Sequence, residues 1–361
     1  MADALAARDE RAARLVRRWL YMVALLVCAM VLIGGATRLT DSGLSITEWR
    51  PVTGALLPLT EEAWFEEFIR YQGIPEYQIV NRGMSIDEFK TIYIWEWVHR
   101  NFGRLIALAY ALPLAWLVAS GRARGRLAGR LFAILGLGAV QAFAGWYMVA
   151  SGIGPDSGVD VSHYRLAVHL GLACVILGAL VWTALDLLPR PARAGGRSAG
   201  ESAARRGAAL LLGLVFAQIL AGALVAGLDA GLTYNTWPLM DGAVVPDGLL
   251  AMSPWHLNFF ENPLTVQFDH RLIAYILLAA ALVHALRVRG EQARRRALWI
   301  AGLVAAQIAL GVATLLASVP IPLGLAHQAM AMVVFVAVVH HLHGAWNAAP
   351  ERAGTEPAPA R

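Results

Sequence analysis

Charged residues and cysteines are scarce in this sequence of 361 residues, and each shortage argues against a class of protein. Only 15% of the residues are charged, 58% are hydrophobic and the mean hydropathy is +0.55, so an ordinary soluble domain is excluded. The two cysteines, Cys28 and Cys174, fall within apolar stretches, where a free cysteine usually acts as a small hydrophobe. Neither a disulfide nor a catalytic thiol is therefore expected. Lys90 is the single lysine among 30 basic residues, a bias that favours a GC-rich bacterial genome.

Eight apolar stretches are each about 20 residues long, the length that crosses the hydrocarbon core of a bilayer. Backbone polar groups find no water there, so these stretches are predicted to be α-helices. The predicted fold class is an all-α polytopic membrane protein with eight transmembrane helices. The stretches are residues 16–36, 98–118, 127–150, 163–185, 205–227, 266–286, 296–317 and 323–345.

Arginines gather on one side of the predicted membrane. They lie before the first stretch, after the second, fourth and sixth stretches, and in the C-terminal tail. By the positive-inside rule this side is the cytoplasm, so both termini are expected there, in a bacterial inner membrane. The net charge of +5 comes largely from these short loops and does not indicate nucleic-acid binding. The first stretch is too long for a signal peptide and is interpreted as a retained helix.

The chain contains an internal duplication. The pattern D-x-G-L-[ST]-x-x-x-W occurs at 41–49, after the first stretch, and again at 229–237, after the fifth. Four helices separate the copies, which preserves their orientation, so the two halves are predicted to be parallel repeats. Each half is expected to form a four-helix bundle. The predicted units are an N-terminal half (1–188), a flexible cytoplasmic linker (189–206), a C-terminal half (207–346) and a disordered tail (347–361).

A second repeated pattern is Gln-x-x-x-Gly within the apolar stretches. Glycines in such steps are typical of close helix packing. The glutamines are interpreted as polar groups that join neighbouring helices, with a ligand role as the alternative. The pattern occurs at Gln141/Gly145, Gln218/Gly222 and Gln307/Gly311.

Two long loops, 37–95 and 228–265, are expected on the outer side, where they would cover the ends of the helices. The stretch from Glu61 to Tyr71 is amphipathic and predicts a surface helix. Ser85 and Glu88 predict a capping box at the start of a helix that runs into the second crossing.

Histidines mark the outer ends of the even-numbered crossings. His99 and His169 belong to the first half, and His270 and His327 belong to the second. Neutral imidazole is a common axial ligand of haem iron, and helix bundles build cofactor sites from facing helices. Each half is therefore predicted to hold one haem between its two histidines. Zinc is not expected, because no cysteine or carboxylate cluster completes a tetrahedral site.

The two halves differ beside these histidines. Glu96 precedes His99 by three residues, which places both on one helix face, and Gln267 takes the equivalent position in the second half. A carboxylate can give or take a proton during chemistry, whereas an electron-transfer haem needs no such group. We therefore assign the reaction to the first half and electron supply to the second. The alternative is an interfacial ion pair between Glu96 and Arg100 or Arg104.

The remaining histidines leave two questions open. Those near the cytoplasmic ends include residues 13 or 14 positions after His270 or His327, which is about 20 Å along a helix at 1.5 Å per residue. That is room for an inner haem, as the alternative to interfacial histidines. Those in or beside the outer loops are either solvated or in contact with haem propionates. The inner set is His284, His340, His341 and His343, and the outer set is His163 and His256.

Several long motifs make the chain resemble the haem A synthases, over residues 16–345. The long first outer loop resembles the alphaproteobacterial and mitochondrial branch of that family. The motifs are the runs 34–45 (GGATRLTDSGLS), 96–100 (EWVHR), 231–238 (GLTYNTWP), 268–271 (FDHR) and 326–328 (AHQ).

The resemblance implies an enzyme that oxidises the C8 methyl group of haem O to a formyl group, by two hydroxylations and loss of water, for terminal oxidase biogenesis. His99 and His169 would flank the substrate haem, with Glu96 as the carboxylate at the reaction site. His270 and His327 would ligate a haem B cofactor that feeds electrons.

The implied partners are a haem O synthase that delivers the substrate, an electron donor that the sequence does not identify, and terminal oxidase assembly proteins. Homo-oligomerisation stays open. Some family members carry a cysteine pair in the first outer loop, and this loop has none, so that redox function does not carry over. Two other functions remain as alternatives: a bis-histidine b-type electron-transfer cytochrome, and a haem-handling assembly factor without catalysis.

Overall fold

The computed structural model describes residues 2–189 and 199–347. Eight of the described helices are long and apolar enough to cross a membrane, which confirms the predicted fold class. They are α1 (Ala2–Leu39), α4 (Ile86–Ala119), α5 (Gly125–Ile153), α6 (His163–Asp186), α7 (Ala199–Gly227), α9 (Pro263–Arg287), α10 (Glu291–Leu316) and α11 (Ile321–Asn347).

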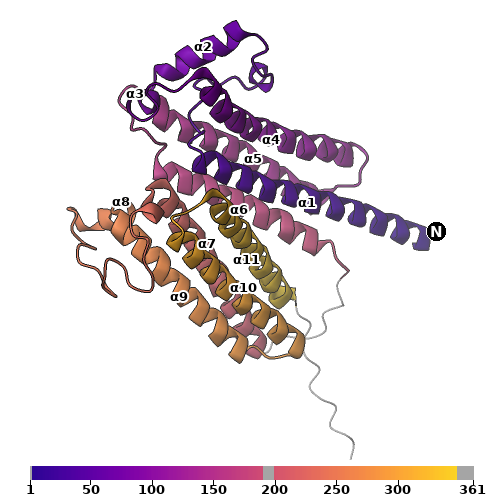
Figure 1. The fold of residues 1–361 in the computed structure, drawn as a ribbon. Coiled ribbons are helices and arrows are strands. Elements are labelled where there is room, and N and C mark those ends of the chain that lie inside the picture. Colours follow the sequence, from indigo (N-terminus) through magenta and orange to yellow (C-terminus); the bar gives the residue numbers. More distant parts are fainter. Residues whose placement is uncertain (1, 190–198, 348–361) are drawn as a thin grey trace, which may run out of the picture.

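The eight helices form two rings of four. In the first ring α1, α4, α5 and α6 pack in sequence, and α6 closes back on α1; α7, α9, α10 and α11 repeat this order in the second ring. The rings meet where α1 packs on α11, α6 on α7, and α6 on α11. Equivalent helices of the two halves thus exchange equivalent contacts, as parallel repeats related by an axis along the membrane normal would. Figure 1 shows the first half in indigo to magenta and the second in orange to yellow.

The connection between the halves differs in part from the predicted linker. Helix α7 begins at Ala199, so residues 199–206 are helical and not a flexible join. Alanine and arginine are strong helix formers, and this explains how the helix continues beyond its apolar segment. Residues 190–198 of the predicted linker, and residues 348–361 of the predicted tail, lie outside the described ranges.

The apolar core lies where the two halves meet and continues into both rings. Among its fully buried side chains are Leu20 of α1, Leu177 of α6 and Leu211 of α7. Cys174 is buried in this core and Cys28 packs against it, and both thiols are free. Each cysteine therefore fills space as a small hydrophobe, as expected from its apolar stretch.

A small cap covers the outer end of the first half. It contains α2 (Glu61–Gln72), which confirms the predicted amphipathic helix, and α3 (Pro75–Ile79). Helix α2 packs on α4, which begins at Ile86 with the predicted capping box of Ser85 and Glu88. His99 consequently lies well inside α4 and not in its first turns. Figure 1 shows α2, α3 and α8 (Asn258–Glu261) at one end of the bundle, opposite the N-terminus.

Arg38 ties the outer ends of the two halves together. Its Nη1 donates to Asp41 Oδ1 at 2.8 Å and its Nη2 donates to Asp229 Oδ2 at 2.8 Å. These two aspartates open the two copies of the duplicated motif, and both adopt the left-handed backbone, with φ of 46° and 49°. Aspartate tolerates this conformation better than most residues. The repeat therefore places two equivalent turns around one shared cation.

The stability of the protein should depend on the pH because of one carboxyl group in the cap. Glu76 of α3 is 6% exposed, and burial raises the pKa of its carboxyl to about 8, with smaller contributions from Asp41 and Glu96. The folded state then holds this proton more tightly than the unfolded state does. The contribution of this group to stability is greatest below the ordinary pKa of 4.5 and falls as the pH rises toward 8. The expected fall is about 1.4 kcal/mol per pH unit.

Thermal unfolding of the detergent-solubilised protein, at several pH values between these two limits, checks this expectation. Glu76→Gln should remove the pH dependence, because a neutral amide stays neutral throughout. Glu66→Gln, on the exposed face of α2, is the matched control and should keep the wild-type slope. A wild type whose melting temperature stays constant over this range would contradict the burial argument.

Candidate functional site

The four predicted site histidines lie on diagonal helices of the two rings. His99 of α4 lies near His169 of α6, and His270 of α9 lies near His327 of α11. In each ring the other two helices lie between the helices that carry the histidines. Each pair therefore meets across the middle of a four-helix bundle, which is where such bundles hold cofactors.

Each histidine ring packs against a glycine on a neighbouring helix. A Cβ atom added at that glycine would lie between 2.8 and 3.1 Å from the ring Cε1 atom. Any side chain there would push the ring away, because packed interiors have little spare volume. The contact is repeated four times, and we call it the glycine seat. The pairs are His99–Gly34, His169–Gly145, His270–Gly222 and His327–Gly311.

Three of the four seats also contain a glutamine, one helical turn before the glycine. Its Nε2 donates to the main-chain carbonyl oxygen of the histidine at 3.0 to 3.1 Å and lies 3.1 to 3.4 Å from the ring nitrogens. The predicted polar link between helices thus has a definite partner, which is the site histidine. The pairs are Gln141–His169, Gln218–His270 and Gln307–His327.

The residues at both histidine pairs fit a haem group. Two imidazoles per site are a standard axial ligand set for haem iron, and the glycine seats hold the rings in the bundle interior. Beside His270, the Nε and Nη1 atoms of Arg271 are buried with no hydrogen-bond partner within the described ranges. In the first half, Arg104 Nη1 is buried in the same state. Unpaired guanidinium donors at the outer end are suited to the carboxylates of haem propionates.

Glu96 lies in a closed hydrogen-bond network. Its Oε1 accepts from Arg100, with distances of 2.6 Å to Nη2 and 3.0 Å to Nε. Its Oε2 accepts from the Ser45 hydroxyl at 2.8 Å and from the Ile46 main-chain N–H at 2.7 Å. Of the two arginines considered from the sequence, Arg100 forms the ion pair. The network fixes a carboxylate one helical turn before His99.

Gln267 occupies the equivalent place in the second half with a neutral side chain. Its Oε1 accepts from Arg271 Nη2 at 2.9 Å, and its Nε2 donates to the Ala230 carbonyl oxygen at 2.7 Å. In both halves, therefore, the side chain at this position bonds to an arginine on its own helix and to the main chain of the outer loop. The negative charge is present in the first half and missing from the equivalent position in the second.

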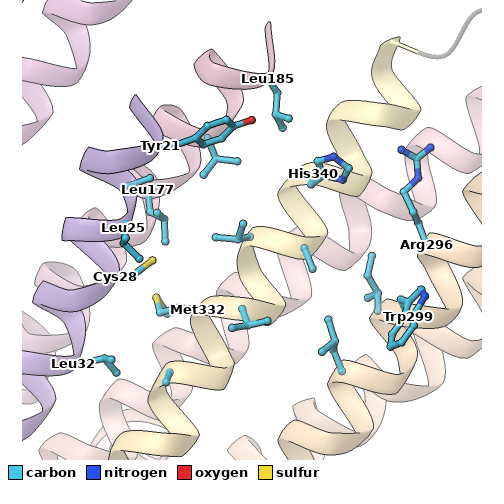
Figure 2. A pocket seen from close by; sticks show the side chains of 18 residues that line it. Tyr21, Leu25, Cys28, Leu32, Leu177, Leu185, Arg296, Trp299, Met332 and His340 are labelled. Atoms are coloured by element: carbon cyan, nitrogen blue, oxygen red, sulfur yellow. The ribbon is translucent and has the colours of Figure 1, made fainter. Parts of the chain in front are cut away.

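A cavity of about 730 Å³ lies between the two halves and apart from the histidine pairs. It is bordered by α1, α6, α10 and α11, and the four site histidines are not among the described residues that line it. Figure 2 shows Tyr21, Arg296 and His340 toward one end of this cavity and Leu32 toward the other. Its apolar lining offers no group for proton transfer along most of its length, so the site is defined by the histidines and not by this cavity.

The structure contradicts an inner haem between His284 and His341. Their Nε2 atoms lie 2.8 Å apart in a direct hydrogen bond, which leaves no space for an iron between them. His343 contacts Asp186 at 2.9 Å, and His340 lines the cavity. Two of these contacts join helices: the His284–His341 bond joins α9 to α11, and the His343–Asp186 bond joins α11 to α6.

The outer-loop histidines differ from one another. His163 is the first residue of α6, and its Nε2 is buried without a hydrogen-bond partner among the residues described. His256 lies in the short turn η3 (Trp255–Leu257) and is exposed. Exposure favours a solvated role for His256, whereas His163 keeps a ring nitrogen available for a propionate.

Sequence reasoning missed the fourth glycine seat. Three Gln-x-x-x-Gly steps were recognised, but Gly34 is preceded by Met30 and so escaped the pattern. The duplication could have revealed this seat. Met30 and Gly34 are separated from Gln218 and Gly222 by the same number of residues as Asp41 is from Asp229, so they occupy equivalent positions in the two halves.

Comparison with known proteins shows which family the chain resembles. Residues 17–339 match the family described as "Cytochrome oxidase assembly protein". The chain is 55% identical to the Heme A synthase of Parvibaculum lavamentivorans over 90% of this chain and 92% of that protein. It is 54% identical to the Heme A synthase of a Methylobacterium species over 93% and 94% of the two chains. It is 50% identical to that of Rhodopseudomonas palustris over 99% and 97%.

Proposed function

The chain belongs to the haem A synthase family of cytochrome oxidase assembly proteins, and on this basis we propose that it is an enzyme that oxidises haem O to haem A. The reaction would convert the C8 methyl group to a formyl group by two hydroxylations and the loss of water. Each hydroxylation would insert one oxygen atom of dioxygen and reduce the other to water, with two electrons and two protons. The observation that carries the assignment to one half is the buried carboxylate of Glu96 where the second half has Gln267.

We propose that His99 and His169 flank the substrate haem, and that His270 and His327 hold a haem B cofactor. The glycine seats support two separate sites, because each pair is held inside its own ring of helices. His270 and His327 would hold the haem B, which would supply electron transfer to the first half. Gln328, beside His327, contacts α1 at Gly35, where a Cβ would lie 1.7 Å from its Oε1. This contact holds α1 of the first half close to α11 of the second half.

Glu96 is proposed to hold or move a proton at its Oε2 atom. The Ser45 hydroxyl bonded to that oxygen can rotate away or pass a proton on, because a hydroxyl is both donor and acceptor. Arg100 keeps the other oxygen in place during the exchange. The charge of Glu96 is buried and that of Arg100 is largely buried, so little water screens them and their electric field at neighbouring reacting groups is strong.

The remaining proposals concern location and partners. The N-terminal end of α1 and the arginine-bearing connections that follow α4 and α9 lie at the end of the bundle opposite the cap (Figure 1), which supports cytoplasmic termini in a bacterial inner membrane. We propose that a haem O synthase delivers the substrate and that terminal oxidase assembly receives the product. The electron donor approaches the second half.

Haem extraction from host membranes tests the proposed function. Cells that make haem O but lack this enzyme should accumulate haem O, and expression of the chain should replace it with haem A, as separated by chromatography. Unchanged haem O with haem bound to the protein would indicate the b-type electron carrier. Unchanged haem O with haem transferred to an acceptor protein would indicate the assembly factor.

A further inference from the structure

The four glycine seats are not equivalent, because one of them has no glutamine. In the other three, the glutamine amide lies beside the ring and donates to the main-chain carbonyl of the same histidine. This contact spans the ring and the backbone, so it restricts rotation of the imidazole against its glycine. The tethered histidines are His169, His270 and His327.

Met30 takes the place of the glutamine in the seat of His99. It precedes Gly34 by one helical turn, as Gln218 precedes Gly222. A thioether donates no hydrogen bond, and the Nδ1 atom of His99 is buried without a partner in the part of the chain that the structure describes. The imidazole of His99 is therefore packed in its seat but not tethered.

The seat of His99 differs from the other three at a second position, which is on the helix that carries the histidine. The residue four positions after the histidine is alanine in the three glutamine seats and Gly103 after His99. The Met30 Cε atom lies 3.4 Å from the position that a Cβ at Gly103 would take. The longer methionine side chain thus uses the room that the glycine leaves. The three alanines are Ala173, Ala274 and Ala331.

The missing tether has a consequence for metal binding. A metal-bound histidine carries a proton on its second ring nitrogen and usually donates it to a polar acceptor, which fixes the ring orientation. The glutamine amides can supply that acceptor through their Oε1 atoms, which have no hydrogen-bond partner among the described residues. Loss of such a partner weakens metal binding by roughly 10- to 100-fold. His99 should therefore be the weaker of the two imidazoles on opposite sides of the same haem.

We propose that His99 is an exchangeable axial ligand and that Met30 is the positioning residue that makes it so. The inference rests on the proposed function in one respect, the binding of a haem between His99 and His169. An exchangeable imidazole leaves one face of that haem accessible to a small molecule. The second half, with two tethered imidazoles, stays closed. The difference between a methionine and a glutamine thus separates a reacting site from an electron-transfer site.

Carbon monoxide binding to the reduced, haem-loaded protein tests this proposal. We expect the wild type to bind carbon monoxide at one of its two haems. The double variant Met30→Gln/Gly103→Ala copies a glutamine seat and should retain both haems, while its apparent affinity for carbon monoxide falls about 10-fold or more. The reciprocal variant Gln218→Met/Ala274→Gly should open the second half and add a second haem that binds carbon monoxide.

Equal carbon monoxide affinity in the wild type and in Met30→Gln/Gly103→Ala, at equal haem content, would overturn the proposal. A reciprocal variant that binds haem but gains no carbon monoxide binding would also overturn it, and this variant decides the question if the first does not fold. Failure of the proposed function is distinguishable, because it appears as unconverted haem O in cells that contain the wild type. The carbon monoxide titration requires bound haem but does not require conversion of haem O to haem A.

Discussion

A Gly311→Ala variant should purify with the haem of its second half largely lost. The new Cβ atom would lie 2.8 Å from Cε1 of His327, so the ring must leave its seat. Overpacking of a tight interior costs about 1–3 kcal/mol, and each 1.4 kcal/mol corresponds to about a tenfold change in binding. We therefore expect haem affinity in this half to fall by roughly 10- to 100-fold. The haem-to-protein ratio and the bis-histidine absorption spectrum measure the loss.

The same helix provides a matched control. Gly302 of α10 has no described atom within 4 Å of an added Cβ, so Gly302→Ala should keep the wild-type haem content. Both variants replace a helical glycine by alanine, which favours the helix by a similar amount. If the two variants held equal amounts of haem, the glycine seat would have no role in cofactor binding.

A Glu96→Gln variant should keep its haems and lose the conversion of haem O. General acid–base groups contribute about 10²- to 10⁴-fold to rates, and a neutral amide cannot accept the proton. Gln267 shows that a glutamine fits beside the equivalent arginine, because its Oε1 accepts from Arg271. The amide nitrogen of the variant would face the Ile46 main-chain N–H, which is a donor, so that hydrogen bond is lost. Loss of a charged hydrogen bond to Arg100 costs about 1.5–3 kcal/mol, which an eight-helix protein can tolerate. Haem chromatography and haem content are the two measurements.

Glu67→Gln separates the role of Glu96 from the general effect of removing a buried carboxylate. Glu67 of α2 is 8% exposed and forms ion pairs with Arg50 and Arg70, so the chemical change is the same at a place away from the histidines. This variant should convert haem O at the wild-type rate. Equal loss of conversion in both variants would mean that Glu96 acts through the fold.

The number and nature of the membrane helices could be predicted because the bilayer acts on each segment separately. A stretch that crosses hydrocarbon must be long, apolar and helical whatever its neighbours are. The capping box of Ser85 and Glu88 is likewise local, since its bonds lie within four residues. The same local signal predicted that the helix of the second crossing extends beyond its apolar part, and α4 does begin at Ile86.

Contacts between helices could not be predicted from the sequence. Gly145 and Gly311 were recognised as packing positions, but nothing in the order of residues shows that a histidine ring fills the space that they leave. The glutamines were read as polar links for the same reason, without their partners. The hydrogen bond between His284 and His341 also depends on how far α9 and α11 approach each other, and hydropathy carries no such distance.

The sequence by itself determined the eight crossings, the parallel duplication and the set of four histidines with Glu96 in one half, because each of these follows from spacing along the chain. The tertiary structure alone decided which glycine receives each imidazole, that Arg100 holds Glu96, and that Met30 leaves His99 without a tether. These facts are set by the approach of side chains from different helices, and that approach is fixed when the two rings pack and not by any single segment.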